Sequence, residues 1–594
     1  MTHTIRRQYL HLNLQGSEAE GFALQNRLSA LCEQWLRPAM EQVLDRCAPA
    51  HGRLCIEHLE VDAGHFRLDH LERDLAGAVA VALEKALLEL IPPGEALSRD
   101  QGSYNKKLKV NALAESSTVI RDQPTDGQPQ IRLKTDPQTA LETLVYFLEN
   151  GRLPWSFRLP PGIGLETYLL AIWEKEPIGS SMISQMVQVL RAPLACRRLV
   201  LQFSAVFWEK LLQDMSPQAY NSVRDIRAML RTASVAHAAP PVPPVFEKRL
   251  WETAFGQVAR GGSIGATALV ALVLAALPEA IVPVLPRLKE LIGTALPTFL
   301  RQLREAAGTN FAVLAPPVAA QWGAWFGPLS PEISSLLNTQ PPLVPTSAEI
   351  HPAVASVPDQ SNQEPRVAHP ADGSNPLPHE STAGGPANCP PPSKQELLPG
   401  HPIDAVRPSK QEPPASRPAD VFAPPTFIPE EGLYVDNAGL VVLHPFLQMC
   451  FEGLGLARDG VLLQPDRALH LLHYLCTGHT PAPEYELTLP KILCNIPLDT
   501  PVEADITLTD QEKEEALGLL QAVIRWWTAL QGTSPDALRG TFLCRPGLLS
   551  RRTDGDWLLQ VEHQSFDILL AELPWGIAAV RLPWMEAVVW VEWG

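Results

Sequence analysis

The sequence predicts a mainly α-helical, multidomain protein that contains small α/β units. The chain has 594 residues, of which 45% are hydrophobic and 19% charged, enough apolar material for several domains. Apolar residues recur at helical spacing over much of the chain, while strand-like alternation is confined to short segments. The 58 prolines make up about 10% of the chain, roughly twice the usual share, and are densest in one segment that separates folded regions.

Residues 1–94 are predicted to form an N-terminal α/β unit. Leu10, Leu12 and Leu14 alternate with polar residues, which predicts a strand. Residues 17–20 have the Ser-x-x-Glu form of a capping box, and apolar residues follow at helical spacing up to Trp35. We expect this helix to bend at Pro38, because proline has no backbone N–H to donate.

A second strand and a second helix complete the N-terminal unit. The apolar segment 54–61 predicts the strand, and an apolar stripe over 71–90, closed by two prolines and a glycine at 92–94, predicts a long helix. The following residues, 95–135, are polar and are predicted to be a loop.

Residues 136–340 are predicted to be a helical region of stacked amphipathic helices. Two helices stand out, over 139–149 with a stop at Asn150-Gly151, and over 197–213. The apolar run 264–277 is too short to cross a bilayer, which favours a buried or interfacial helix over a membrane span.

Residues 341–431 are predicted to be a disordered, proline-rich linker. Positions 341–430 hold 22 prolines, no Trp or Tyr, and ten acidic against five basic side chains. Such a composition buries too little apolar surface to offset the chain entropy lost on folding. The pentapeptide Pro-Ser-Lys-Gln-Glu occurs twice, at 392–396 and 408–412.

Residues 432–594 are predicted to form a C-terminal α+β domain that is rich in tryptophan. Helices are expected near 442–454, 466–477 and 511–530. Strands are expected where apolar residues alternate, around 557–561 and 589–593. Seven of the 14 tryptophans lie between 526 and 593, primarily as material for a core.

Charge and cysteine content exclude several functional classes. Lys and Arg number 48 against 65 Asp and Glu, so the formal net charge of −17 disfavours binding to nucleic acid. The nine cysteines are scattered without a C-x-x-C pair, as in buried thiols of a reducing compartment. The first residues contain no apolar signal core, so we expect a cytoplasmic protein without a membrane span.

Two patterns invite a chemical role, and neither is favoured. Residues 261–265 match the G-x-S-x-G nucleophile elbow, but the residues before Ser263 have helical periodicity where an elbow needs a strand. We therefore interpret Ser263 as a helix cap. His470, His473, Cys476 and His479 recur at every third residue, a spacing that turns by about 180° around a helix and cannot converge on one metal ion. An ordinary packed helix ending at 477–478 is preferred, and no cofactor motif is found.

Three Leu-Pro-Trp tripeptides combine a rigid backbone with a large ring, at 153–155, 573–575 and 582–584. This combination suits corners of a fold or anchors in an interface, and corners are the more common use. The candidate structural or interface residues are their tryptophans, Trp155, Trp575 and Trp584, together with Trp593 near the C-terminus.

Several of these motifs together resemble the contractile injection system tape measure protein family. The resemblance covers about 1–90, 136–215 and 432–594. It rests on residues 5–14, 24–32, 57–64 and 141–155, and, in the C-terminal domain, on 443–447, 467–478, 486–494, 538–543, 573–575, 582–585 and 591–593.

The resemblance implies a structural component of a bacterial, phage-tail-like particle, concerned with tube length and tube assembly. It carries no catalytic residues, and it implies tube, hub, spike or baseplate proteins as partners, with incorporation into the particle left open. A ruler made of one long helix would need sustained heptads, which are absent, so an assembly factor with folded ends fits better. A cytoplasmic adaptor or chaperone for tube subunits or cargo is the alternative, and a serine hydrolase built on Ser263 is the third.

Overall fold

The computed structural model describes residues 3–5, 8–15, 17–48, 53–56, 58–90, 131–232, 241–262, 265–338 and 432–593. Except for Asn338, these residues belong to one compact unit that combines 1–337 with 425–594. Contacts between the helical region and the C-terminal domain therefore lie within one unit. The predicted linker 341–431 lies outside the described residues.

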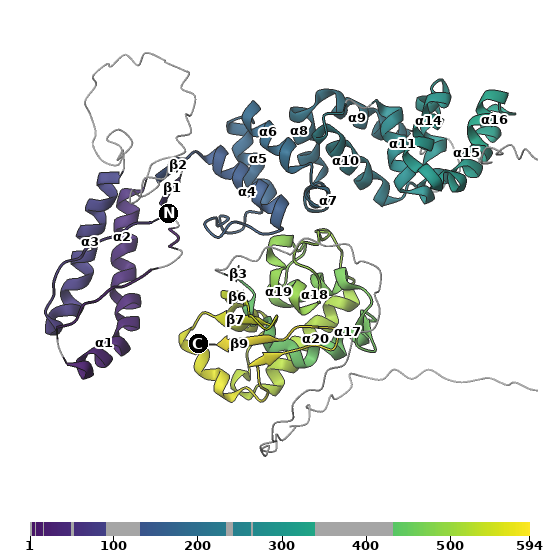
Figure 1. Ribbon diagram of the computed structural model, residues 1–594. Helices are drawn as coiled ribbons and strands as arrows, with labels where there is room; N and C mark the ends of the chain where they lie inside the picture. Colours follow the sequence, from purple (N-terminus) through teal and green to yellow (C-terminus); the bar gives the residue numbers. More distant parts are fainter. Residues whose placement is uncertain are drawn as a thin grey trace, which may run out of the picture. The chain divides into compact units, whose positions relative to one another are not determined.

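The described residues of the N-terminal part include three α-helices and one strand pair (Figure 1). The helices are α1 (Glu18–Leu31), α2 (Arg37–Cys47) and α3 (Leu71–Leu90), and α2 packs along α3. A π-helical turn, Cys32–Leu36, separates α1 from α2, so the predicted bend occurs one turn before Pro38, which lies in the first turn of α2. The predicted capping box is formed, because the Ser17 amide donates to Glu20 Oε2 over 2.7 Å.

The strands of this part differ from the prediction. Strand β1 (Arg53–Ile56) is shorter than expected, and its antiparallel partner is β2 (Ile131–Lys134), at the end of the segment predicted as a loop. The prediction of a strand at 10–14 is wrong: residues 8–15 are in no strand, and their leucines are exposed. A strand needs a neighbouring strand with which to form hydrogen bonds. Here β1 pairs with β2 and not with residues 10–14. Residues 95–130 lie outside the described part.

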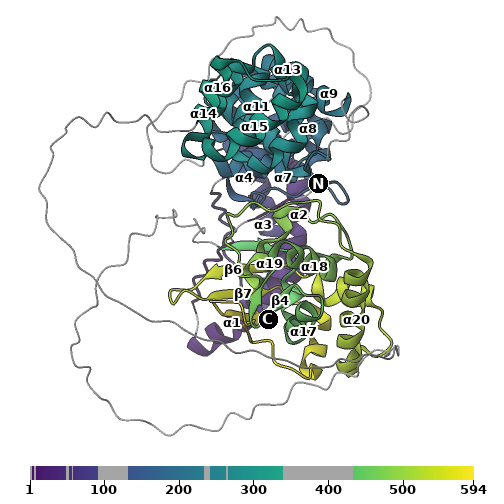
Figure 2. The same cartoon turned by 90° about the vertical axis from the view of Figure 1, so that its right-hand side faces the viewer.

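The helical region packs short helices around one core and forms a single block in Figure 2. Its helices are α4 (Asp136–Asn150), α5 (Leu165–Lys175), α6 (Ser180–Val189), α7 (Pro193–Gln202), α8 (Ala205–Met215), α9 (Pro217–Thr232), α10 (Pro244–Ala259), α11 (Ala266–Ala276), α12 (Ile281–Val284), α13 (Lys289–Gly293), α14 (Leu296–Ala307), α15 (Phe311–Phe326) and α16 (Pro331–Leu337).

Local signals located one of the two predicted helices correctly and missed a break in the other. Helix α4 ends where predicted, with Gly151 in the left-handed conformation at φ 70°. The helix expected over 197–213 is divided into α7 and α8, because Phe203 adopts an extended backbone. Ser204 directly precedes α8, and both its amide and its hydroxyl donate to the Glu166 carboxylate.

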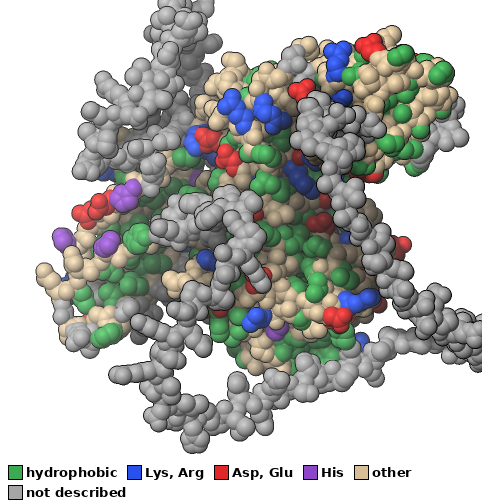
Figure 3. Space-filling view, turned by 45° about the vertical axis from the view of Figure 1, so that its right-hand side comes forward, with side chains coloured by type: hydrophobic (Ala, Val, Ile, Leu, Met, Phe, Trp, Pro, Cys, Tyr) green, Lys and Arg blue, Asp and Glu red, His purple; other side chains and the backbone are tan. Residues whose placement is uncertain are grey.

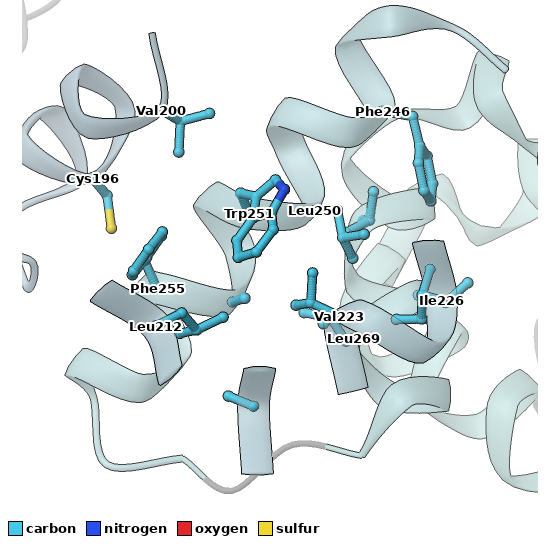
Figure 4. Close-up of a cluster of buried hydrophobic side chains, with 14 of the residues drawn as sticks. Cys196, Val200, Leu212, Val223, Ile226, Phe246, Leu250, Trp251, Phe255 and Leu269 are labelled. Atoms are coloured by element: carbon cyan, nitrogen blue, oxygen red, sulfur yellow. The ribbon is translucent and has the colours of Figure 1, made fainter. Parts of the chain in front are cut away.

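The side chains labelled in Figure 4 come from helices α7, α8, α9, α10 and α11 and belong to the helical core. Trp251 and Phe255 of α10 are fully buried among residues of α7, α8, α9 and α11. The apolar run 264–277 contains α11, whose Leu269, Val270 and Leu274 are buried, as predicted. Within the described residues, no single helix is long and apolar enough to span a bilayer, although the bent pair 266–276 and 278–293 passes on length and composition.

The C-terminal domain packs helices against a mixed sheet (Figure 1). The sheet order is β3-β6-β7-β9-β8, and only β7 and β9 run parallel. The predicted strands are β7 (Trp557–Val561) and β9 (Val589–Trp593), and the predicted helices are α17 (His444–Gly453), α18 (Pro465–Thr477) and α20 (Asp510–Trp526). The remaining elements, which were not predicted, are β3 (Leu433–Val435), β4 (Ala457–Arg458), β5 (Val461–Leu462), α19 (Thr488–Leu493), α21 (Pro535–Leu538), β6 (Gly547–Arg551) and β8 (Ala579–Val580).

Gly439 marks the closest approach of two backbone segments in this domain. A Cβ atom there would lie 1.7 Å from the Phe542 carbonyl oxygen and 2.7 Å from Leu543 Cα, both backbone atoms. We expect Gly439→Ala to lower the free energy of unfolding by about 3 kcal/mol or more, because the backbone itself must move. The matched control is Gly453→Ala, where a Cβ meets nothing within 4 Å. Equal thermal unfolding midpoints for the two variants would contradict this reading.

Candidate functional site

The first Leu-Pro-Trp motif presents its tryptophan at the surface. It follows the Gly151 cap of α4, and the Trp155 side chain is 37% exposed. The neighbouring Arg152 is half-buried, and its Nε and Nη1 atoms are buried with no hydrogen-bond partner among the described residues. A guanidinium in this state is costly unless an acceptor is supplied. Residues 152–155 thus combine an exposed ring with an unsatisfied cation.

The other two motifs turn their rings into the C-terminal domain. The Trp575 indole donates to the Val442 carbonyl over 3.0 Å and meets the Phe446 ring edge-on at 5.1 Å. Trp584 is buried, donates to the Leu493 carbonyl over 2.8 Å, and stacks on Phe451. Proline before each ring fixes the backbone at these corners.

Trp593 ends strand β9 and is half-buried. The Arg545 guanidinium lies 5.4 Å from its ring centroid and forms a buried ion pair with Asp567 at 2.6 Å. Burial opposes ionisation of Asp567, but hydrogen bonds from Arg545 and the Gln564 amide outweigh it and lower the pKa of this carboxyl. An interface role for the four tryptophans stays a prediction, and Trp155 is the most exposed of the three motif tryptophans.

A buried ion cluster connects α7 with the C-terminal domain. Arg198 of α7 and Glu484 are both fully buried, and Arg198 Nε donates to Glu484 Oε2 over 2.9 Å. Lys491 of α19, 2% exposed, donates to the other carboxylate oxygen over 2.6 Å. One anion therefore lies between two cations. Burial lowers the pKa of Lys491, while the Glu484 carboxylate opposes that shift.

Backbone carbonyls accept further hydrogen bonds from both cations of this cluster. Arg198 also donates to the carbonyls of Leu148 and Asp499, and Lys491 donates to those of Leu498 and Thr500. Each cation is thus hydrogen-bonded on several sides, which offsets the cost of removing it from water.

Neighbouring hydrogen bonds extend the contact along α7. The Gln202 side chain accepts from the Glu484 amide and donates to the Val502 carbonyl, each over 2.8 Å. The Ala504 amide donates to the Leu201 carbonyl over 3.1 Å. The end of α7 is therefore bonded to the C-terminal segment 484–504 through both backbone and side chains.

Sequence reasoning did not identify this cluster. Arg198 and Glu484 are 286 positions apart in the sequence. One local signal was available: Gly151, which ends α4, carries no Cβ, and a Cβ there would lie 2.4 Å from Glu484 Oε1. The glycine that was interpreted only as a helix stop also leaves room for the buried carboxylate.

The residues with metal-ligand spacing on α18 have separate partners. His470 Nε2 lies 2.7 Å from the Glu503 carbonyl, and His473 Nε2 lies 2.8 Å from Glu486 Oε2. Cys476 Sγ lies 3.6 Å from Cys544 Sγ. The helix ends at Thr477 with Gly478 as its left-handed cap, as predicted. No group of three or more His, Cys, Asp or Glu within the described ranges could hold a metal ion.

The hydrolase hypothesis has no support from the surrounding structure. Ser263 itself lies outside the described residues. The residues before the G-x-S-x-G motif form helix α10, as predicted, where a nucleophile elbow needs a strand.

A half-buried histidine, His444, and a fully buried one, His470, predict a loss of stability in acid. Burial is the largest influence on His444 and His470 and lowers both pKa values, against weaker hydrogen bonds to carbonyls that raise them. Below pH 6.5 the unfolded chain takes up protons that the folded chain does not, so stability falls as the pH drops. We expect a lower urea midpoint at pH 5.5 than at pH 7.5. Replacing both histidines by glutamine should reduce the difference between the urea midpoints at the two pH values. An unchanged difference would contradict this prediction.

Comparison with known proteins gives one result. A family model described as contractile injection system tape measure protein matches residues 2–593. No curated protein and no solved structure matches the chain significantly.

Proposed function

This chain belongs to the contractile injection system tape measure protein family, and from that premise we propose that it acts as a folded assembly factor for the tube rather than as a helical ruler. Membership assigns it a structural and assembly role in the injection system. How that role is performed depends on whether the chain works folded or extended.

The short length of the helices carries the proposal. Among the described residues, the longest helix is α3, with 20 residues, which spans about 30 Å. Helices α4 to α16 bury one shared core, in which Trp251, Phe255 and Phe299 are fully buried. A ruler made of one extended helix would have to expose that core to water, at roughly 1.5–3 kcal/mol for each large apolar side chain. This cost favours a protein that works in its folded form.

We place the partner contact at Arg152 and Trp155. The partners are tube, hub, spike or baseplate proteins, met in the cytoplasm before the chain enters the particle. Trp155 would supply apolar contact area, and the half-buried Arg152 beside it would attract an acidic surface on the partner. On the face drawn in Figure 3, basic, acidic and hydrophobic side chains are interspersed. The role requires no catalysis by this chain.

Graded deletions test the folded assembly factor against the ruler. Residues are removed in steps within 345–425, and particle length is measured by electron microscopy. We expect an unchanged length. A ruler would instead shorten the particle by about 1.5 Å for each residue removed, and such a linear series would overturn the proposal.

Particle composition tests the partner contact. With a tagged chain, tube or baseplate proteins should co-purify, and Trp155→Ala and Arg152→Ala should each reduce their recovery. Trp35→Ala, which changes an exposed tryptophan on another element, is the control. Equal recovery with all three variants would contradict the assigned surface. Absence of the chain from finished particles would favour the chaperone instead.

A further inference from the structure

Two cysteines that are distant in the sequence meet at one end of α18. Cys476 lies in the last turn of α18, and Cys544 follows the π-helical turn Arg539–Leu543. Their sulfur atoms are 3.6 Å apart, and Cys544 Sγ also lies 3.3 Å from the Cys476 carbonyl oxygen. A disulfide needs about 2.05 Å between the sulfurs, so a movement of about 1.5 Å, within reach of side-chain rotation, would join them.

The two thiols differ in access to solvent. Cys476 is 1% exposed, whereas Cys544 is exposed. A reagent in solution therefore reaches Cys544 first, and Cys476 can react only with a group already attached to Cys544. This is the arrangement of an attacking thiol and a resolving thiol.

The contact between the two thiols favours a thiolate on Cys544. The hydrogen bond between the two thiols is the largest influence and lowers the pKa of Cys544, while the same contact raises the pKa of Cys476. Arg539, whose Nε donates to the Leu475 carbonyl over 3.2 Å, favours the Cys544 thiolate as well. Partial burial of the thiol and the carboxylates of Glu486 and Asp436 act against it. A thiolate is the nucleophilic form of cysteine.

We propose that Cys476 and Cys544 form a redox-active thiol pair that closes into an intramolecular disulfide when it meets a small-molecule disulfide such as glutathione disulfide. The Cys544 thiolate attacks one sulfur of the oxidant, the oxidant's S–S bond breaks, and one thiolate leaves. Cys476 then gives up its proton and attacks Cys544 Sγ, which releases the second thiolate. The two cysteines are oxidised, the oxidant is reduced to two thiols, and the two cysteine protons end on those thiols.

The bond would join the end of α18 to the segment that leads into β6. These positions are 68 residues apart, and closing a loop of that size restricts the unfolded chain strongly. The C-terminal domain should unfold at a temperature about 5 to 15 °C higher in the oxidised protein. The proposal is independent of the assembly role, because it concerns a covalent state of one domain.

The test uses the full chain and glutathione disulfide. After incubation, free thiols are blocked with N-ethylmaleimide and the protein is digested for mass spectrometry. We expect one cross-linked peptide pair containing Cys476 and Cys544, two hydrogen masses lighter than the reduced pair. The unfolding temperature should rise and return to its starting value after dithiothreitol.

Single substitutions separate the two roles. Cys476→Ser should stop the reaction at a mixed disulfide on Cys544, and Cys544→Ser should leave Cys476 unmodified. Cys55→Ser, in the N-terminal part, is the control and should form the cross-link as the native chain does. The proposal is overturned if the native chain keeps a stable mixed disulfide on Cys544, remains fully reduced, or forms its cross-link between other cysteines.

Discussion

Replacing Glu484 with glutamine should lower the free energy of unfolding by about 3 to 5 kcal/mol. The substitution keeps the size and shape of the side chain but removes the only anion of the ion cluster. Arg198 and Lys491 would remain buried with no negative charge between them. An uncompensated buried charge is among the most destabilising changes known in proteins, and here two would be left together.

Urea unfolding followed by tryptophan fluorescence measures this effect. The matched control is Glu503→Gln, which removes a carboxylate paired with Lys248 in a partly exposed contact of the same segment. Solvent screens that pair, so we expect a loss below about 1 kcal/mol. If Glu484→Gln and Glu503→Gln shift the midpoint equally, the buried cluster does not have the importance assigned to it.

Truncation after Gln560 should prevent the C-terminal domain from folding and abolish particle assembly. It removes β8 and β9, and with β9 the parallel partner of β7 along its whole length, from Trp557–Val589 to Val561–Trp593. It also removes Trp575 and Trp584, which hold two corners of the domain. The buried side chains of β7 would face water, and the loss exceeds the total stability of an ordinary domain.

Circular dichroism and thermal unfolding of the truncated chain measure the outcome. Trp590→Ala is the control, because it changes an exposed tryptophan of β9, 41% exposed, and leaves the strand in place. This variant should unfold cooperatively near the native temperature and still assemble. A truncated chain that keeps a cooperative transition at the native midpoint would show that β9 is not needed to complete the sheet.

Elements with local signals were predictable from the sequence. Helix α18 begins at a proline and ends at a glycine, and α20 begins with a capping box in which Thr509 and Glu512 bond each other's backbone. Along β7 and β9, apolar residues occupy alternate positions, and this alternation can be seen in the sequence. In each case the signal lies within the element, so no knowledge of a distant partner was required.

Elements that depend on distant partners were not predictable. The leucines at 10–14 alternate as a strand does, but β1 pairs with β2, which begins 75 positions after β1 ends. At the break between α7 and α8, Ser204 donates to Glu166, which lies 38 positions earlier in the chain. The ion cluster depends on a pairing across 286 positions. Alternation and periodicity report the two faces of one segment and carry no information about its neighbour.

The ion cluster also sets an order of events during synthesis. Arg198 leaves the ribosome well before Glu484, and at 5 to 20 residues per second the interval for 286 residues is about 15 to 60 seconds. Throughout this time the Arg198 guanidinium lacks its counter-ion, because Glu484 has not yet been synthesised. The final structure of the helical region is therefore completed only when the C-terminal domain emerges, and a nascent chain stalled before residue 484 presents an open cationic surface at the end of α7.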